Sequence, residues 1–326
     1  MVVMQRKALI LAPLALLASS AWSAAATDIA FGITSSTAFS LPHYIATEKK
    51  YYETENLAVD TIVAGAAVGV LKQLAAGSLN IAQAATDQSL RAILHGAPIK
   101  IIAGAASNAP FRVLAAKNIT GWSDLKGKTI SVGGLTDVTL YFVRVMARKN
   151  GLADHDYDLI YGGGTPSRFA QLASGAAAAA ILTNPVDFTA LEQGFVDLGS
   201  VPQYLPHWAQ NNLLVDTRWA GGHRAAVTAF LRTHIRATRY FYDPANRDDV
   251  IAILAKHTRT TPQVAALTYA LYVRDEVIAP EAALFESGIR ANLDAFVAMG
   301  ELAEAPALAG FLDTSYLAEA RTGPAP

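Results

Sequence analysis

The 326-residue chain contains no cysteine, and only 16% of its residues are charged. The lack of cysteine excludes a thiolate nucleophile, cysteine-ligated zinc, an iron–sulfur cluster and a disulfide framework. Neither sign of charge dominates, because the chain has 26 Lys and Arg and 27 Asp and Glu. The net charge of -1 does not indicate the excess of positive charge that is typical of nucleic-acid-binding proteins. Hydrophobic residues make up 52% of the chain, so we expect large buried cores and, from the length, about two domains.

Residues 1–26 have the composition of a secretory signal peptide. Arg6 and Lys7 precede an apolar run over residues 8–17, and the small residues from Ala24 to Ala26 provide a cleavage site. The apolar run is shorter than the ~20 residues that a membrane-spanning helix needs, and no cysteine follows it to carry a lipid. We predict cleavage near Ala26 and a soluble periplasmic protein without a lipid anchor. An uncleaved N-terminal membrane anchor is the alternative.

An internal repeat follows the signal segment, with a constant offset of ninety-eight positions. Strand residue Asp60 recurs as Asp158. Glycines at turns and helix ends recur in the same register, with Gly65, Gly77 and Gly96 matching Gly163, Gly175 and Gly194. Strands alternate with helices within each copy, which is typical of a parallel sheet. We therefore predict two similar α/β lobes, each a mostly parallel sheet flanked by helices.

The predicted first lobe is discontinuous in sequence. Lobe one comprises residues 27–107 and 209–326, and lobe two comprises residues 108–208. The second part of lobe one begins with a strand near residue 212 and is otherwise mainly helical, with helices over 223–242, 246–256, 262–273 and 280–299. We expect this helical region to pack on lobe one. The two crossings between lobes, at residues 105–111 and 205–212, would then form a hinge.

Several segments together carry a family resemblance. They are Pro42–Glu53, Leu74–Ala82, Trp122–Ile130, Gly163–Arg168 and Asp313–Ala320. In order and spacing they resemble the solute-binding proteins of nitrate/sulfonate/taurine-type ABC transporters (NMT1/THI5-like, SsuA/TauA-like), over nearly the whole mature chain. The resemblance implies a two-lobed periplasmic-binding-protein fold (type II), a ligand held in the cleft, and delivery to a permease with its ATPase. Lys50 and Asn56 depart from the family pattern, which usually has Gly at both positions.

The expected ligand site lies where strands end and helices begin. Ligands of open parallel sheets bind beyond the carboxyl ends of the strands, and helix N-termini there attract anions. The loops at these places are rich in Gly, Ser, Thr and Asn, and they span residues 34–40, 64–69, 85–87, 133–139, 162–166 and 183–185. We therefore predict that a small organic anion binds between them. The candidate ligand-binding residues are Ser35, Ser36, Thr37, Phe39, His43, Thr86, Asp87, Arg112, Gly134, Thr136, Asp137, Thr139, Asn184, Pro185, Trp208 and Asn211.

Structural roles compete with these binding roles. Ser, Thr, Asn and Asp at such positions are also ordinary helix caps, so the prediction depends on the loops converging. Tyr44, Phe111 and Arg168 are further cleft candidates whose alternative role is packing or structural. The triple glycine at residues 162–164 lacks the Gly-Lys-Ser/Thr ending of a phosphate-binding loop, and a permissive turn explains it better.

The predicted function is binding without catalysis. The His residues show no metal-ligand spacing and there is no Gly-x-Ser-x-Gly nucleophile motif, so we predict no catalytic residue, no metal and no cofactor. The expected partners are a small organic anion and an ABC permease, with no nucleic acid, and the expected state is a monomer. Sulfonate, taurine-like, aromatic carboxylate and nitrate-like ligands remain open. The alternatives are an enzyme on the same fold (thiamine pyrimidine precursor synthesis or a menaquinone-pathway elimination), a binder of a neutral pyrimidine, and a structural envelope protein.

Overall fold

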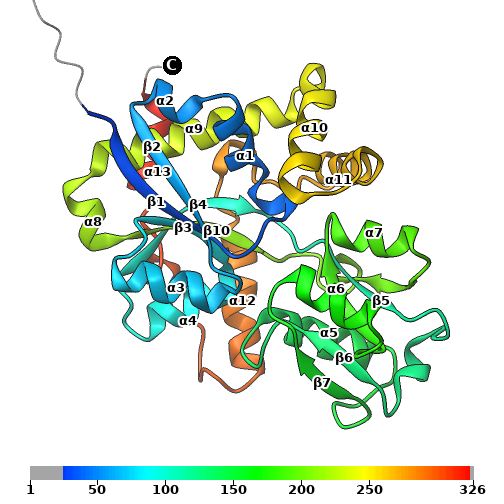
Figure 1. Ribbon diagram of the computed structural model, residues 1–326. Coiled ribbons are helices and arrows are strands. Elements are labelled where there is room, and N and C mark those ends of the chain that lie inside the picture. The colour runs from blue at the N-terminus through cyan, green and yellow to red at the C-terminus, as the bar shows by residue number, and fades with distance from the viewer. Residues whose placement is uncertain (1–24, 324–326) are drawn as a thin grey trace, which may run out of the picture.

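A computed structural model describes residues 25–323, so all but the last two residues of the predicted signal peptide lie outside the described residues. The described chain is built on two five-stranded mixed sheets, which form the upper and the lower right parts of the molecule in Figure 1. The first sheet has the order β2-β1-β3-β10-β4. Its strands are β1 (Thr27–Ile33), β2 (Leu57–Val63), β3 (Ile81–Ala85), β4 (Ile99–Ala106) and β10 (Asn211–Asp216). We call this sheet with its helices the first lobe.

The second sheet repeats the arrangement of the first, with the order β7-β6-β8-β5-β9. Its strands are β5 (Phe111–Ala115), β6 (Thr129–Val132), β7 (Asp158–Tyr161), β8 (Ala179–Thr183) and β9 (Val196–Ser200). Each sheet has parallel pairing among its first three strands and one inserted antiparallel strand, β10 in the first and β5 in the second. We call this sheet with its helices the second lobe. The predicted fold class is therefore confirmed.

Helices flank both sheets. Those of the repeated part are α1 (Leu41–Glu48), α2 (Tyr51–Thr54), α3 (Ala67–Ala76), α4 (Thr86–Leu94), α5 (Val138–Lys149), α6 (Thr165–Ala173) and α7 (Val186–Glu192). The later ones are α8 (Thr217–Gly222), α9 (Arg224–Tyr242), α10 (Arg247–Thr258), α11 (Pro262–Arg274), α12 (Glu286–Ala298) and α13 (Ser315–Thr322). Short 3-10 turns are η1 (Ala38–Ser40), η2 (Trp122–Leu125), η3 (Val201–Gln203), η4 (Pro244–Asn246), η5 (Pro280–Ala282) and η6 (Leu308–Gly310).

The C-terminal helices pack mainly on the first lobe, as predicted. Helix α9 contacts α1, α2 and β2, and α12 contacts α4, while α11 also reaches α7 of the second lobe. The helix expected over residues 280–299 is wrong in its first part, since it is divided into η5 and α12. Glu281 and Ala282 have φ angles of 52° and 54°, which interrupt a helix. This turn places the carbonyl group of Ala283 against Gly104 of β4.

The matching glycines of the repeat adopt matching conformations. Gly77 and Gly175 end their helices with φ angles of 80° and 77°, in the left-handed region that glycine tolerates. Lys50 and Asn56, which depart from the family pattern, also adopt left-handed φ angles of 56° and 55°. The backbone there has the conformation that glycine favours, and at Lys50 it carries the strain of a residue with a Cβ atom.

A row of buried aromatic rings joins the two lobes. Phe39 of the first lobe lies 6.0 Å from Phe111 of β5, measured between ring centroids, and Phe111 lies 5.7 Å from Phe142 of α5. Trp208 then stands edge-on to Phe142 at 5.2 Å. These rings belong to one apolar cluster that extends through both lobes. The burial of this apolar surface holds the chain crossings together.

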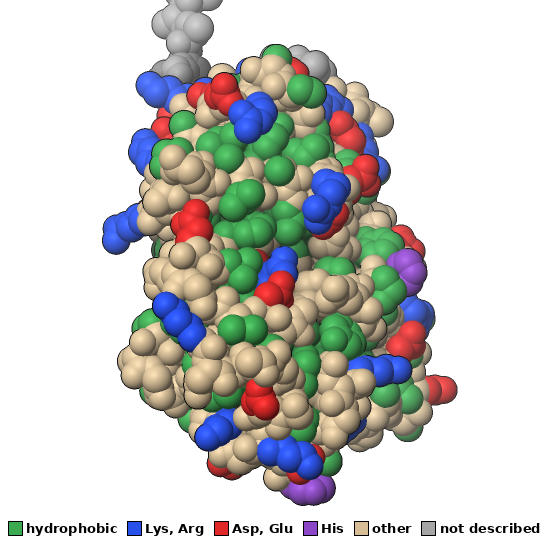
Figure 2. All heavy atoms as spheres, turned by 90° about the vertical axis from the view of Figure 1, so that its right-hand side faces the viewer, with side chains coloured by type: hydrophobic (Ala, Val, Ile, Leu, Met, Phe, Trp, Pro, Cys, Tyr) green, Lys and Arg blue, Asp and Glu red, His purple; other side chains and the backbone are tan. Residues whose placement is uncertain are grey.

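The surface agrees with the charge balance of the sequence. Figure 2 shows Lys and Arg side chains interspersed with Asp and Glu over the side that carries α7, α10 and α11. Within residues 25–323, no helix combines the length and the apolar character needed to cross a membrane.

Candidate functional site

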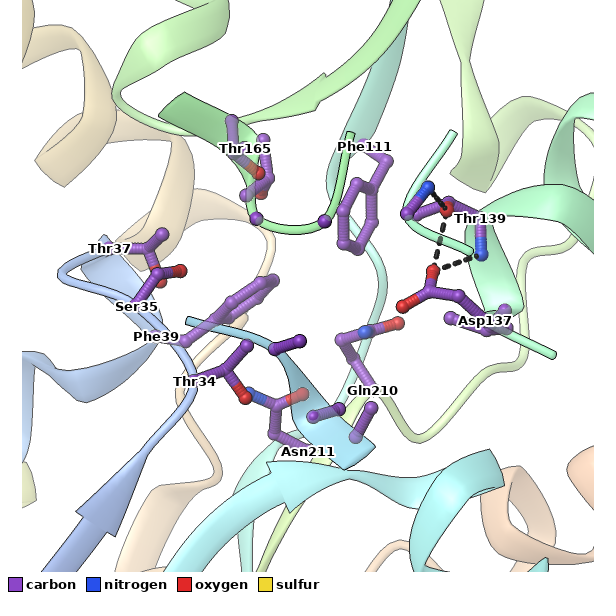
Figure 3. A pocket seen from close by; sticks show the side chains of 18 of the residues that line it. Thr34, Ser35, Thr37, Phe39, Phe111, Asp137, Thr139, Thr165, Gln210 and Asn211 are labelled. Atoms are coloured by element: carbon purple, nitrogen blue, oxygen red, sulfur yellow. Dashed lines mark hydrogen bonds between the residues drawn. The ribbon is translucent and has the colours of Figure 1, made fainter. Parts of the chain in front are cut away.

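A pocket lies between the two lobes, where strands of both sheets end (Figure 3). Its cavity volume is about 80 Å³. The six loops that were expected to converge all contribute lining residues, at positions 34–40, 66–67, 85, 133–139, 163–165 and 183. Phe39 and Phe111 provide apolar surface, and most of the remaining lining is hydroxyl, amide or backbone. This composition suits a small ligand with polar ends.

Six of the sequence-predicted residues line this pocket: Ser35, Thr37, Phe39, Asp137, Thr139 and Asn211. Ser36 and Gly134 belong to lining loops but do not line the pocket, and Pro185 is buried beside it without lining it. Thr86 and Asn184 are also displaced from the pocket, because their side chains are used inside the protein. The Thr86 hydroxyl accepts a hydrogen bond from Asn212 at 2.7 Å, and the Asn184 amide donates to the Asp187 carboxylate at 2.8 Å.

His43 is a core residue rather than a ligand-binding one. Its side chain is 3% exposed, and its ring nitrogens lie 2.9 Å from the Tyr52 hydroxyl and 2.8 Å from the Thr61 hydroxyl. Burial lowers the pKa of His43 to about 3, so the ring is neutral. His43 does not line the pocket, so its expected role in ligand binding is corrected.

Arg112 does not line the pocket. Its guanidinium pairs with Asp197 of β9 and lies 3.5 Å from the carboxylate of Asp187. These two carboxylates come from the second lobe itself and compensate its charge. Arg112 therefore does not offer a free cation to a ligand. Burial raises the pKa of its partner Asp187 to about 6.

The helix ends around the pocket are of two kinds. The N-terminus of α5 is already occupied, because the Asp137 carboxylate accepts from the Thr139 N–H at 2.9 Å. Helix α5 thus begins at Val138, directly after this cap. The N-termini of α3 and α6 have Ala66 and Gly164 as caps, neither with a side-chain hydrogen bond. At α3 the first-turn N–H groups remain available for an anion. At α6 only the Thr165 N–H remains, because Pro166 has no N–H and the Ser167 N–H donates to the Gly164 carbonyl at 3.1 Å.

Arg168 is a buried cation beneath the α6 end of the pocket. Its Nε donates to the Ile181 carbonyl at 2.7 Å, its Nη2 donates to the Thr165 hydroxyl at 2.9 Å, and its Nη1 donates to the Gly163 carbonyl. Burial lowers the pKa of Arg168 to about 10, which leaves it charged at neutral pH. The guanidinium fixes the turn at Gly163 and adds positive potential to it.

Sequence reasoning missed two amides in the pocket, Gln83 and Gln210. Gln83 lies in the otherwise apolar strand β3, and its Nε2 donates to the Phe39 carbonyl at 2.8 Å. Gln210 lies at the return crossing, next to Asn211. A polar residue within an apolar strand was the available signal for Gln83. No comparable signal marks Gln210.

Asp87, Thr136 and Trp208 line a different cavity, between α4 and α12 on one side and α5 on the other. Here the lobes are bridged, since Gln88 Nε2 and Arg91 Nη1 both donate to the Thr136 carbonyl, the second at 3.2 Å. Burial raises the pKa of Asp87 to about 7, and the charge of Asp137 adds to the effect. We call these hydrogen bonds the α4 bridge.

No group of three or more His, Cys, Asp or Glu side chains suited to a metal ion occurs within residues 25–323. The titratable groups of the pocket are Asp137 and Arg168. Both are engaged, the carboxylate with Thr139 and the guanidinium with backbone and Thr165. This set resembles a binding site more than a nucleophile with its base.

Solved structures with the same fold include binding proteins. The alkanesulfonate-binding protein SsuA from Xanthomonas axonopodis pv. citri, bound to MOPS, has a TM-score of 0.73 and 19% identity, over 90% of this chain and 99% of that chain. The ligand-binding component of an ABC-type import system from Staphylococcus aureus, with zinc bound, has a TM-score of 0.76 and 13% identity, over 90% and 99%. The nitrate-binding protein NrtA from Synechocystis PCC 6803 has a TM-score of 0.63 and 15% identity, over 73% and 69%.

These similarities show a periplasmic-binding-protein fold. No curated protein sequence matches the chain. The family model described as NMT1/THI5 like matches residues 38–246, a range that begins at the pocket loop after β1 and ends beyond the return crossing. Since that range covers more than half of the sequence, the chain belongs to the NMT1/THI5-like family.

Proposed function

We propose that the protein is the extracytoplasmic solute-binding component of an ABC importer. It binds a small organic anion in the pocket between the lobes and delivers it to a membrane permease that works with an ATPase. The observation that carries this proposal is a small pocket enclosed by six loops, three from each lobe. The binding functions named for SsuA and NrtA support the same role.

Recognition of the anion rests on groups that need no free cation. The N-terminus of α3 presents N–H groups without a side-chain cap, and α6 adds the N–H of Thr165. The hydroxyls of Ser35, Thr37 and Thr165 also line the pocket. Arg168 adds positive charge behind Thr165. Aligned peptide dipoles and hydroxyl donors together bind a carboxylate, sulfonate or nitrate group.

Release and capture require the lobes to separate. We propose lobe one as residues 27–107 and 209–326, lobe two as residues 108–208, and the crossings between them as the hinge. The lobes approach closely at the glycine turn, where a Cβ atom on Gly164 would lie 3.2 Å from the carbonyl oxygen of Gly65. Only glycine permits this approach without displacement, so the turn serves as the meeting point of the closed lobes.

Export is the remaining part of the proposal. The signal peptide is expected to direct the protein to the periplasm, with cleavage near Ala26. N-terminal sequencing of periplasmic protein decides this point. An intact Met1 in the mature protein would remove the basis for an extracytoplasmic role.

The function is tested by mass spectrometry of ligand released from natively purified protein, followed by calorimetry and solution scattering with the identified compound. We expect a small organic anion, a lower radius of gyration on binding, and stabilisation by about 2.7 kcal/mol at a hundredfold excess over Kd. Turnover of the compound into a product would instead indicate an enzyme. Tight binding without compaction would contradict the hinge.

A further inference from the structure

The pocket contains buried hydrogen-bond acceptors that no protein group satisfies. Gln83 and Gln210 are 2% and 3% exposed, and both line the pocket. The Oε1 atom of each has no hydrogen-bond partner among the residues that the structure describes. At Gln83 the orientation of the amide is fixed, because its Nε2 already donates to the Phe39 carbonyl at 2.8 Å. Its Oε1 is therefore the atom left without a partner.

A carboxylate lies beside one of these acceptors, that of Gln210. Asp137 lines the pocket, and one of its oxygens, Oδ1, accepts from both the N–H and the hydroxyl of Thr139, at 2.9 and 2.5 Å. Its Oδ2 has no hydrogen-bond partner among the described residues. Figure 3 shows Asp137 and Gln210 on the same side of the pocket. A carboxylate cannot donate a hydrogen bond and carries negative charge, so the Asp137 side of the pocket attracts a donor and repels an anion.

The opposite side has the opposite character. In Figure 3, Ser35, Thr37 and Thr165 lie across the pocket from Asp137, and Phe39 and Phe111 lie between the two sides. The N-terminus of α6, which has no side-chain cap, and the charged Arg168 lie on the same side as Thr165. The pocket is therefore polarised, with an anion-binding side, an apolar middle and an acceptor side.

We infer that the ligand is a small zwitterion, with its anionic group at Ser35, Thr37 and Thr165 and a protonated amino group at Asp137 and Gln210. This inference rests on the proposed function, because it names the class of organic anion that the same pocket takes. An ammonium group has three donors and no acceptor, which matches the Asp137 carboxylate and the Gln210 amide oxygen. A ligand without a donor would leave the buried Oε1 atoms of Gln83 and Gln210 without partners, which is unfavourable.

Two matched pairs of probes test the inference: ethanesulfonate against 2-aminoethanesulfonate, and propanoate against 3-aminopropanoate. A neutral amine, 4-aminopyrimidine, completes the set. In calorimetry with the full mature protein, we expect each amino acid probe to bind at least about tenfold more tightly than its partner without the amino group.

Asp137→Asn is the informative variant, because Asn caps helices as well as Asp and the start of α5 is retained. We expect it to reduce the preference for the amino group to about threefold or less, since it removes the charge that pairs with the ammonium. Gln210→Met removes an acceptor at similar size and should weaken only the amino-bearing probes. Asp243→Asn is the matched control, since Asp243 caps η4 by accepting from the Ala245 N–H at 2.9 Å, outside the pocket. It should leave the preference unchanged.

The outcomes separate the two proposals. Equal or tighter binding of ethanesulfonate and propanoate would overturn the zwitterion and leave the anion importer standing. An unchanged preference in folded Asp137→Asn protein would overturn the placement of the amino group at Asp137. Preference for 4-aminopyrimidine over every acid, or no binding of any probe up to about 10 mM, would overturn the zwitterion and the proposed function together.

Discussion

The α4 bridge predicts how much of the ligand affinity comes from contact between the lobes rather than from contact with the ligand. Gln88 and Arg91 of the first lobe both donate to the carbonyl of Thr136 in the second. Under the proposed hinge these bonds form only when the lobes close, so their free energy adds to binding and not to the folding of either lobe. Gln88→Ala removes one neutral hydrogen bond across the cleft and leaves the bond from Arg91.

A neutral hydrogen bond contributes about 1 kcal/mol, so Gln88→Ala should raise Kd about fivefold. The stability of the ligand-free protein should change little, since Gln88 otherwise bonds only the neighbouring Asp87 at 3.0 Å. Calorimetry gives the Kd, and thermal unfolding without ligand gives the stability. Gln263→Ala, on the exposed first turn of α11, is the matched control and should leave both unchanged. An unchanged Kd in Gln88→Ala would show that the bridge contributes nothing to closure, and the reasoning would fail.

The remaining predictions concern charge, packing and pH. Arg112→Gln should weaken ligand binding by less than about tenfold, because the guanidinium serves Asp197 and not the pocket; calorimetry that finds binding abolished in a folded variant would contradict this. Gly104→Ala should destabilise the protein by about 3 kcal/mol in urea unfolding, because its Cβ would lie 2.0 Å from the Ala283 carbonyl oxygen, whereas Gly121→Ala, with open space around it, should change little. Burial raises the pKa of Asp87 to about 7, so the folded protein favours the protonated form of this carboxyl group. Its contribution to the free energy of unfolding is therefore present at low pH and is lost as the pH rises through about 7. Unfolding free energies near pH 5 and pH 8 should show this loss in the wild type, and a loss of the same size in Asp87→Asn would refute it.

The order of strands and the two-lobe plan were predictable because they depend on local signals. Gly77 and Gly175 end helices by themselves, and a repeat with constant spacing implies two similar sheets. The break before α12 was not predictable from residues 280–285, because it follows from a distant contact. The turn through Glu281 and Ala282 lets the backbone reach Gly104, which lies far earlier in the sequence.

The loops of the candidate site were predictable, but the side chains that enter the pocket were only partly so. Loops at the ends of parallel strands must meet, whatever their sequence. The direction of each side chain depends on partners elsewhere in the chain. Arg112 pairs with Asp187 and Asp197 and does not line the pocket, and His43 contacts Tyr52 and Thr61 in the core.

The inserted antiparallel strands impose an order on the folding of the chain. All strands of the second sheet come from one continuous stretch, residues 111–200, so that sheet is complete as soon as this stretch has emerged. In the first sheet, β4 pairs with β3 only through β10, which is formed by residues 211–216. The first sheet therefore keeps an open edge until residues 211–216, which follow the whole second sheet in the sequence, have been added. Such an edge exposes backbone groups to pairing with other chains, so the incomplete first lobe is the part of the protein most exposed to aggregation during folding.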